Sequence, residues 1–207
     1  MNANVVYDAR ASIDIVPAVK KAVCAVSGGM DSASCLFHAV KTYGNKNVIA
    51  VSMYYGQRHD IELEKAKQEC EKLDVDHIEL DLTLVFNFNK SLSALMKDSG
   101  KEIQEKSYSE IMHEKIKSDE APISDEYVPN RNSLFINVLC AIGLQKFNNE
   151  PFTVIVGVHS DDDLKAEGSN VSAYPDCSVE FVEATNKALQ FATAGLCYIY
   201  APLARKT

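Results

Sequence analysis

The residue types best suited to chemistry lie in one short stretch of this 207-residue chain, VSGGMDS. It consists of Val26, Ser27, Gly28, Gly29, Met30, Asp31 and Ser32. The adjacent glycines let the backbone adopt positive φ and bring main-chain N–H groups close to a ligand. The serines offer hydroxyl groups, and Asp31 offers a carboxylate that suits a magnesium ion bridging phosphate oxygens. A helix starting after the glycines adds partial positive charge, so the stretch predicts a phosphate or pyrophosphate site.

Two well-known phosphate-binding motifs are absent from this stretch. It lacks the G-K-[ST] of a Walker A loop and the G-x-G-x-x-G of a dinucleotide fingerprint. An ordinary turn between a strand and a helix, with glycine at the bend and serine or aspartate as N-cap, would use the same residue types. A phosphate site is favoured because both serines, both glycines and the aspartate occur together after the first apolar run.

Alternating strands and helices are expected to position this loop. Apolar, β-branched runs predict strands at 21–27, 47–56, 76–86, 152–158 and 196–203. Helical spacing predicts helices at 30–44, 58–74, 128–147 and 178–193, the last of them burying Phe181, Ala184, Ala188 and Ala192. This alternation predicts an α/β fold with about five parallel strands and helices on both faces. Ligands bind beyond the carboxyl ends of such strands, where residues 26–32 lie.

The chain length favours a single domain over residues 1–207. Residues 1–21 carry little pattern and are interpreted as a leading extension. A polar insertion near 87–126, rich in Lys, Glu and Ser, interrupts the alternation. Long connections in compact domains are usually functional, so the insertion is expected to mark the active-site side.

Charge and cysteine content restrict the function classes. The formal net charge of -8 and pI near 5.1 argue against a nucleic-acid partner. The six cysteines are spaced singly, without a C-x-x-C pair, and no secretory segment opens the chain, which favours reduced thiols in a cytoplasmic protein. No apolar stretch has the length of a membrane span, so no membrane partner is expected.

Three further stretches accompany the loop in a fixed order: YYGQRHDIELEKA (54–66), YVPNRNSLF (127–135) and YPDCSVEFVEATNKAL (174–189). SGGMDS after a strand resembles the PP-loop of the N-type ATP pyrophosphatases. The four stretches together resemble the 7-cyano-7-deazaguanine synthase family, from about residue 22 to the APL near the end. The resemblance implies a Rossmann-like PP-loop fold and an ATP-dependent C–N ligase. Its expected reaction converts 7-carboxy-7-deazaguanine and ammonia to the nitrile precursor of queuosine, through adenylated carboxylate and amide intermediates.

The resemblance also implies roles for individual residues. It assigns nucleotide binding to residues 26–32 with Tyr55, Gly56 and Gln57. It assigns Mg²⁺ binding to Asp31. Catalytic roles fall to Ser27, Asp31, Ser32, Arg58 and Arg131. Deazaguanine binding falls to Arg58, His59, Arg131, Asn132, Tyr174 and Asp176. In this interpretation Asp176 accepts hydrogen bonds from the purine-like ring, and Tyr174 stacks on it.

Structural roles compete with several of these assignments. Residues 57–59 would otherwise form a solvated turn capped by Asp60. Arg131 and Asn132 would otherwise lie in an exposed first helical turn, and Asp176 would otherwise be the N-cap of the last helix. Buried packing is the favoured interpretation of Cys177. His159 with residues 161–163 is interpreted as a solvated acidic loop rather than a metal cluster.

The chain departs from the family in its cysteines and loops. Members normally continue past APL into a C-G-x-C-x-x-C zinc site, whose spacing none of these cysteines has, so no zinc ligand is assigned. Zinc is expected only with a further C-terminal segment. The loop 158–177 and the insertion before Tyr127 are longer than expected, which leaves open a variant that stops at the amide or uses another amine. Another PP-loop ATP ligase and a non-catalytic nucleotide-binding module are further alternatives, and the resemblance implies a homodimer.

Overall fold

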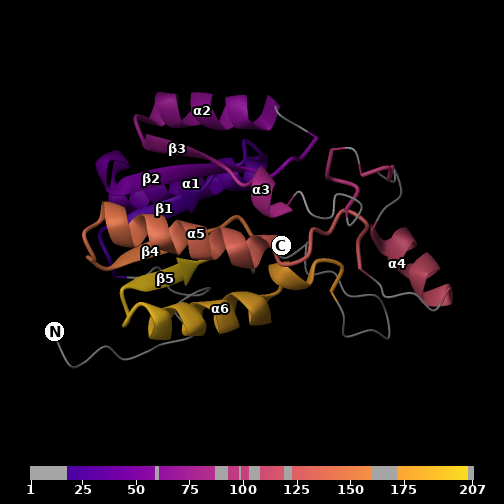
Figure 1. Ribbon diagram of the computed structural model, residues 1–207. Coiled ribbons are helices and arrows are strands. Elements are labelled where there is room, and N and C mark those ends of the chain that lie inside the picture. Colours follow the sequence, from indigo (N-terminus) through magenta and orange to yellow (C-terminus); the bar gives the residue numbers. More distant parts are fainter. Residues whose placement is uncertain are drawn as a thin grey trace.

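The computed structural model describes residues 18–58, 61–86, 93–97, 99–102, 108–118, 123–159 and 172–204. The strands are β1 (Ala22–Ala25), β2 (Val48–Tyr54), β3 (Asp76–Asp81), β4 (Phe152–Ile155) and β5 (Cys197–Tyr200). The helices are α1 (Met30–Tyr43), α2 (Ile61–Leu73), α3 (Thr83–Phe86), α4 (Tyr108–Lys117), α5 (Arg131–Lys146) and α6 (Val179–Ala192). Figure 1 shows the strands side by side, with α5 in front of them and α4 apart from the sheet.

The sheet has five parallel strands in the order β3-β2-β1-β4-β5. The predicted α/β fold is therefore confirmed. From β1 the chain runs outward through β2 to β3 and later fills the other side with β4 and β5. The strand order thus reverses between β1 and β4, and ligands of open α/β sheets bind at such a switch point, beyond the carboxyl ends of the strands.

Two hydrophobic clusters cover the two faces of the sheet. Successive side chains of a strand point to opposite faces. Val23 accordingly packs in a cluster with residues of α5 and α6, whereas Cys24 packs in a cluster with residues of α1 and α2. β4 is buried along its whole length, as expected for a strand covered by helices on both sides. The predicted helices on both faces are confirmed, and the sheet is a rigid support for the loops at its carboxyl edge.

Two parts of the sequence-based element assignment were wrong. The strand predicted at 76–86 ends at Asp81, whose carboxylate accepts a hydrogen bond from the N–H of Thr83 at 2.8 Å. This contact starts the short helix α3 at residues 83–86. In addition, residues 108–117 of the polar insertion form α4, which was not predicted.

The predicted buried face of α6 was also wrong. The buried residues of this helix are Val182, Asn186, Leu189 and Gln190, and the three alanines predicted to be buried are exposed. Asn186 faces β5 because its side-chain oxygen accepts the N–H of Ile199 at 2.9 Å. The buried amide therefore satisfies a backbone donor on an edge strand, which apolar spacing does not reveal.

Candidate functional site

A cavity of about 390 Å³ lies at the carboxyl ends of β1, β2 and β4. Its walls combine residues of the loop after β1, the first turns of α1 and α5, and the segment just beyond β4. The cavity is therefore at the switch point of the sheet, where sequence reasoning placed the site. Of residues 26–32, only Gly28 is not part of the lining.

The loop between β1 and α1 is held by its own hydroxyl groups. The Ser32 hydroxyl donates to the Gly29 carbonyl at 2.9 Å and accepts the Ser27 N–H at 3.1 Å. The Ser27 hydroxyl donates to the Ser32 oxygen at 3.1 Å. Gly29 is the N-cap of α1 and provides no side-chain acceptor, so the N–H groups of the first turn are available to an anion.

Gly28 fixes the loop against α2. Its φ is +77°, and a Cβ built on it would lie 2.0 Å from the Glu62 carbonyl oxygen. Any side chain here would therefore displace the loop from the start of α2. Gly28 contributes to the site through the backbone path, while its neighbours line the cavity.

Gly157 is a site residue that sequence reasoning missed. It lines the cavity directly beyond β4, and a Cβ built on it would lie 3.4 Å from the Ser32 nitrogen. The start of α1 and the end of β4 therefore approach closely. The available signal was a glycine near the end of the fourth apolar run, at the strand end where ligands bind.

Arg131 lies on the cavity wall together with Tyr55. A terminal nitrogen of its guanidinium donates to the Tyr55 hydroxyl at 3.0 Å, and its central carbon is 5.5 Å from the centroid of the same ring. Burial lowers the pKa of Arg131, but the contact with Tyr55 and the Asp176 carboxylate together raise it above the ordinary value. The cavity thus contains a permanently charged group that suits a phosphate or a carboxylate.

Asn132 connects the start of α5 to the segment before α6. Its N–H donates to an Asp176 carboxylate oxygen at 3.1 Å, and its side-chain nitrogen donates to the Cys177 sulfur at 3.2 Å. The N-cap of α5, Asn130, makes no side-chain capping bond, so Asp176 supplies that acceptor from elsewhere in the chain. Burial raises the pKa of Asp176, while the Asn132 N–H and the Arg131 charge act in the opposite direction.

Asp176 and Cys177 differ in their position relative to the cavity. Asp176 is 5% exposed and does not line the cavity. Cys177 is part of the cavity lining. The N-cap of α6 is Ser178, whose hydroxyl accepts the Phe181 N–H at 3.1 Å. The alternative that makes Asp176 the cap of that helix is therefore wrong.

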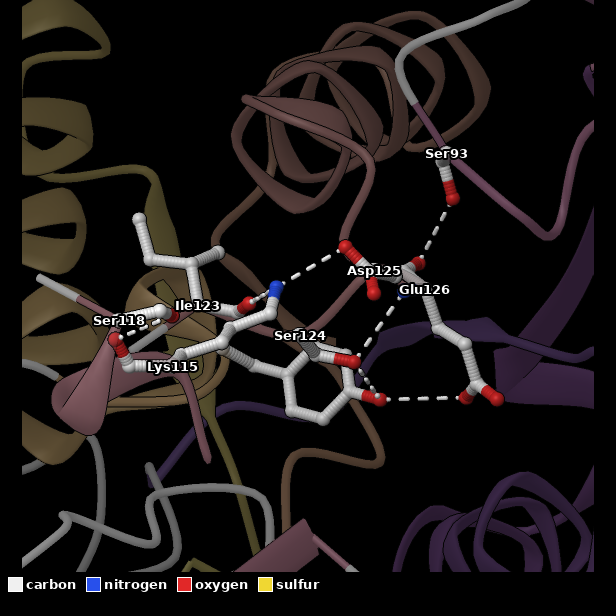
Figure 2. Close-up of polar contacts among 8 residues, drawn as sticks. Ser93, Lys115, Ser118, Ile123, Ser124, Asp125 and Glu126 are labelled. Carbon is white, nitrogen blue, oxygen red and sulfur yellow. Dashed lines mark hydrogen bonds and ion pairs between the residues drawn. The ribbon is translucent and has the colours of Figure 1, made fainter. Parts of the chain in front are cut away.

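Tyr174 is buried beside the cavity and not in its lining. Its hydroxyl accepts a hydrogen bond from Ser124 at 3.0 Å and donates one to the Glu126 carboxylate at 3.2 Å. Figure 2 shows the two partners of this hydroxyl, Ser124 and Glu126. The structure therefore places Tyr174 in a polar network with Ser124 and Glu126, outside the cavity lining.

The residues after β2 separate into two groups. Tyr55 and Gln57 line the cavity, and the Gln57 side-chain oxygen accepts the Tyr55 N–H at 2.9 Å. Gly56 and Arg58 do not line it, and the Arg58 side chain donates to groups at residues 96–101. His59 lies outside the described residues.

The described part of the chain holds no group of three or more His, Cys, Asp or Glu able to bind a metal. Asp31 and Glu62 are acidic residues of the cavity lining. Mg²⁺ is usually held by one or two carboxylates together with substrate phosphates, so this donor set fits it. Of the acidic loop considered above, only His159 is described. Among the described helices, none is long and apolar enough to cross a membrane.

Proteins similar to this chain point to one family. The chain matches the family described as "Queuosine biosynthesis protein QueC" over residues 21–207. It is 35% identical over 173 residues to a protein of Clostridium botulinum (strain ATCC 19397 / Type A) named 7-cyano-7-deazaguanine synthase, covering 84% of this chain and 67% of the relative. A protein of the same name from Staphylococcus aureus (strain bovine RF122 / ET3-1) is 34% identical over 185 residues, covering 89% and 70%.

Among solved structures, the chain matches an NH3-dependent NAD synthetase from Campylobacter jejuni subsp. jejuni NCTC 11168. The TM-score is 0.44 at 16% sequence identity, and the match covers 87% of this chain and 69% of the other. The fold is assigned from the strand order and connections of the chain itself.

Proposed function

The chain belongs to the QueC family of queuosine biosynthesis proteins, and we propose that its cavity converts 7-carboxy-7-deazaguanine, ammonia and ATP into 7-cyano-7-deazaguanine. One observation carries the placement of the reaction. A helix N-terminus without a side-chain cap, flanked by two serines, shares a cavity with the partly buried cation of Arg131. Two anionic groups, a pyrophosphate and a carboxylate, can therefore be held in one small space.

The first half of the reaction is adenylation of the carboxylate. The loop 26–32 binds the β- and γ-phosphates through its N–H groups and hydroxyls, and Arg131 orients the carboxylate. A carboxylate oxygen attacks the α-phosphorus, the bond to the β-phosphate oxygen breaks, and pyrophosphate leaves. Mg²⁺ would supply positive charge at the phosphate oxygens, and Asp31, which lines the cavity, would hold it. The loop donors and the α1 dipole stabilise charge that develops on the leaving group.

The second half replaces the adenylate with nitrogen. Ammonia attacks the acyl carbon, the bond to AMP breaks, and a proton is lost to give the amide. The amide oxygen then attacks the α-phosphorus of a second ATP, and pyrophosphate leaves again. Loss of AMP and of the remaining N–H protons forms the nitrile. Each round releases AMP and pyrophosphate, and holding the reacting groups together lowers the barrier of both rounds.

Mass spectrometry of the base and of the adenine nucleotide tests this function. The purified protein is incubated with ATP, Mg²⁺, ammonium and 7-carboxy-7-deazaguanine, and nitrile with AMP is the expected product pair. Asp31→Ala should slow AMP formation by more than about 100-fold. Lys46→Ala is the control, because it removes an exposed ion pair with Asp74 and should leave turnover unchanged.

Other products would overturn the proposal in distinct ways. Amide with AMP, and no nitrile, would indicate an enzyme that completes only the first round. Absence of AMP from the wild-type reaction would contradict ligase activity and favour a nucleotide-binding module. Unchanged AMP formation by Asp31→Ala would remove residues 26–32, which we call the phosphate loop, from the mechanism.

A further inference from the structure

One residue of the cavity lining comes from the polar insertion. We call residues 93–97 and 99–102 the wall segment. Leu95 of this segment lines the cavity, and Met96 is buried in a cluster with Tyr55 and Val128. The segment thus contributes an apolar surface to the site, although it belongs to neither a regular strand nor a helix.

Arg58 holds the wall segment through its backbone and its side chain. Its N–H donates to the Leu95 carbonyl at 3.1 Å. The guanidinium donates from Nε to the Met96 carbonyl at 3.3 Å and from one terminal nitrogen to the Ser99 hydroxyl at 3.0 Å. The same nitrogen also donates to the Lys101 carbonyl at 2.5 Å. Nε and one terminal nitrogen are therefore committed to protein acceptors.

The segment is also attached to the end of β2 next to Arg58. The Lys97 N–H donates to the Gly56 carbonyl at 2.8 Å, and Gln57 forms an antiparallel bridge with Met96. Gln57 and Tyr55 both line the cavity. A displacement of the wall segment would therefore also shift the end of β2, where Tyr55 and Gln57 line the cavity.

A second attachment fixes the start of the segment. The Ser93 hydroxyl donates to the Glu126 carbonyl at 2.9 Å, and the Ala94 N–H donates to the Asp125 carbonyl at 2.8 Å. Figure 2 shows the first of these bonds, together with the Lys115 ammonium, which bonds to the Asp125 carboxylate at 2.9 Å. The wall segment therefore connects the end of β2 to residues 125–126, which precede α5.

We propose that Arg58 is a positioning residue that holds the wall segment so that Leu95 forms part of the cavity wall. The proposal rests on the proposed function, because it assumes that this cavity is the reaction site. An anion bound to Arg58 would compete with the carbonyl acceptors of the segment. A planar guanidinium reaches several acceptors in fixed directions, which a lysine ammonium does not reproduce.

Hydrogen–deuterium exchange in the ligand-free protein tests the positioning role directly. In Arg58→Ala and Arg58→Lys, the Lys97 amide and its neighbours in the wall segment should exchange roughly 10-fold faster or more. Ser99→Ala removes one acceptor and should give a smaller increase in the same amides. Ser27→Ala is the matched control, because it alters the phosphate loop and should leave the wall segment unchanged.

The opposite pattern would overturn the proposal. If wall-segment exchange is unchanged in ligand-free Arg58→Ala, while ATP or the deazaguanine acid no longer protects the variant, then Arg58 is an anion ligand. Because the measurement needs no turnover, failure of the synthase reaction would not imitate either result.

Kinetics provide the second test. A contact with the cavity wall stabilises the bound substrate and the transition state equally. Arg58→Lys should therefore raise the KM of the substrate that contacts Leu95 about 10-fold, with little change in kcat. Leu95→Ala should raise the same KM. The double variant Arg58→Lys/Leu95→Ala should have a KM no higher than the higher of the two single-variant values, because Arg58 acts through Leu95. Additive effects, or a fall in kcat with unchanged KM, would contradict the proposal.

Discussion

The phosphate loop and the wall segment line the same cavity, but different kinds of contact hold them in place. The hydroxyl contacts of the loop join residues two to five positions apart, such as Ser32 with Gly29 and with Ser27. The contacts of the wall segment reach much farther along the chain, as between Arg58 and Ser99, which are 41 positions apart. The hydroxyl network of the loop is therefore local, and Gly28 packs the loop against α2, whereas the side-chain contacts of the wall segment depend on the fold being assembled around it.

This difference predicts that the two regions will respond to different substitutions. The loop should be sensitive to changes that alter its backbone path. The wall should be sensitive to the loss of individual side-chain donors and acceptors, and its loss should loosen the cavity without removing the phosphate site.

Gly28→Ala should have the largest effect, and Gly100→Ala in the wall segment is its matched control. Both glycines have positive φ, +77° and +71°, which costs an alanine roughly 1–2 kcal/mol. Only at Gly28 would the new Cβ also collide with a backbone atom, the Glu62 carbonyl oxygen. We expect AMP formation to fall by more than about 100-fold in Gly28→Ala and by less than about 10-fold in Gly100→Ala.

The rate of AMP formation and the urea midpoint of unfolding would be measured for both variants. Equal losses of activity would contradict the role assigned to the contact between the loop and α2. A loss of activity in Gly28→Ala at an unchanged urea midpoint would strengthen the assignment, because the substitution would then have altered the loop without destabilising the fold.

Tyr174→Phe should have an intermediate effect on stability. It removes a hydroxyl that joins Ser124 to Glu126, whose carbonyl accepts the Ser93 hydroxyl of the wall segment, and a lost buried hydrogen bond costs about 1–2 kcal/mol. Tyr43→Phe is the matched control, since the Tyr43 hydroxyl is buried without a hydrogen-bond partner among the described residues. That variant should be neutral or slightly stabilising. Urea unfolding of both variants checks the prediction, and an equal loss in the two would contradict it.

The smallest effect should be the pH dependence contributed by His77 at the base of the phosphate loop. Its Nε2 lies 2.8 Å from the Ser52 hydroxyl, which donates to the Val26 carbonyl. Burial lowers the pKa of His77, although the nearby Glu79 opposes the shift. Folding therefore favours the neutral ring. The resulting stability is present above the ordinary His value of about 6.5 and is lost as the pH falls toward the lowered pKa.

Urea midpoints of the wild type and of His77→Gln, measured from about 1 unit above to about 1 unit below the ordinary His pKa of about 6.5, test this sign. The wild type should lose more stability than the variant as the pH falls. A parallel decline in both proteins would show that other groups control the acid response.

The sequence predicted the regions whose structure is local. Apolar runs and helical spacing predicted the α/β sheet, and the glycines and serines of residues 26–32 predicted a loop that does line the cavity. The resemblance to the synthase family is confirmed by the family match over residues 21–207. These features succeed because each one depends on residues adjacent in the chain or on a regular period.

The remaining features depend on partners distant in sequence. The contacts of Arg58 with the wall segment could not be predicted, because its acceptors are mostly backbone carbonyls of an irregular stretch. The capping of α5 by Asp176 joins residues 44 positions apart. The buried face of α6 was misassigned because Asn186 is a polar residue whose partner is an edge strand. Apolar periodicity carries no information about such pairs.

Hydrogen–deuterium exchange of the wild-type protein, with and without ATP and Mg²⁺, would test the central contrast most directly. The account predicts that nucleotide protects the amides of residues 27–33 and of Gly157 and Val158. The wall segment should already be protected in the ligand-free protein and should change little. Protection that develops in the wall segment only with nucleotide, without change in residues 27–33, would contradict the account.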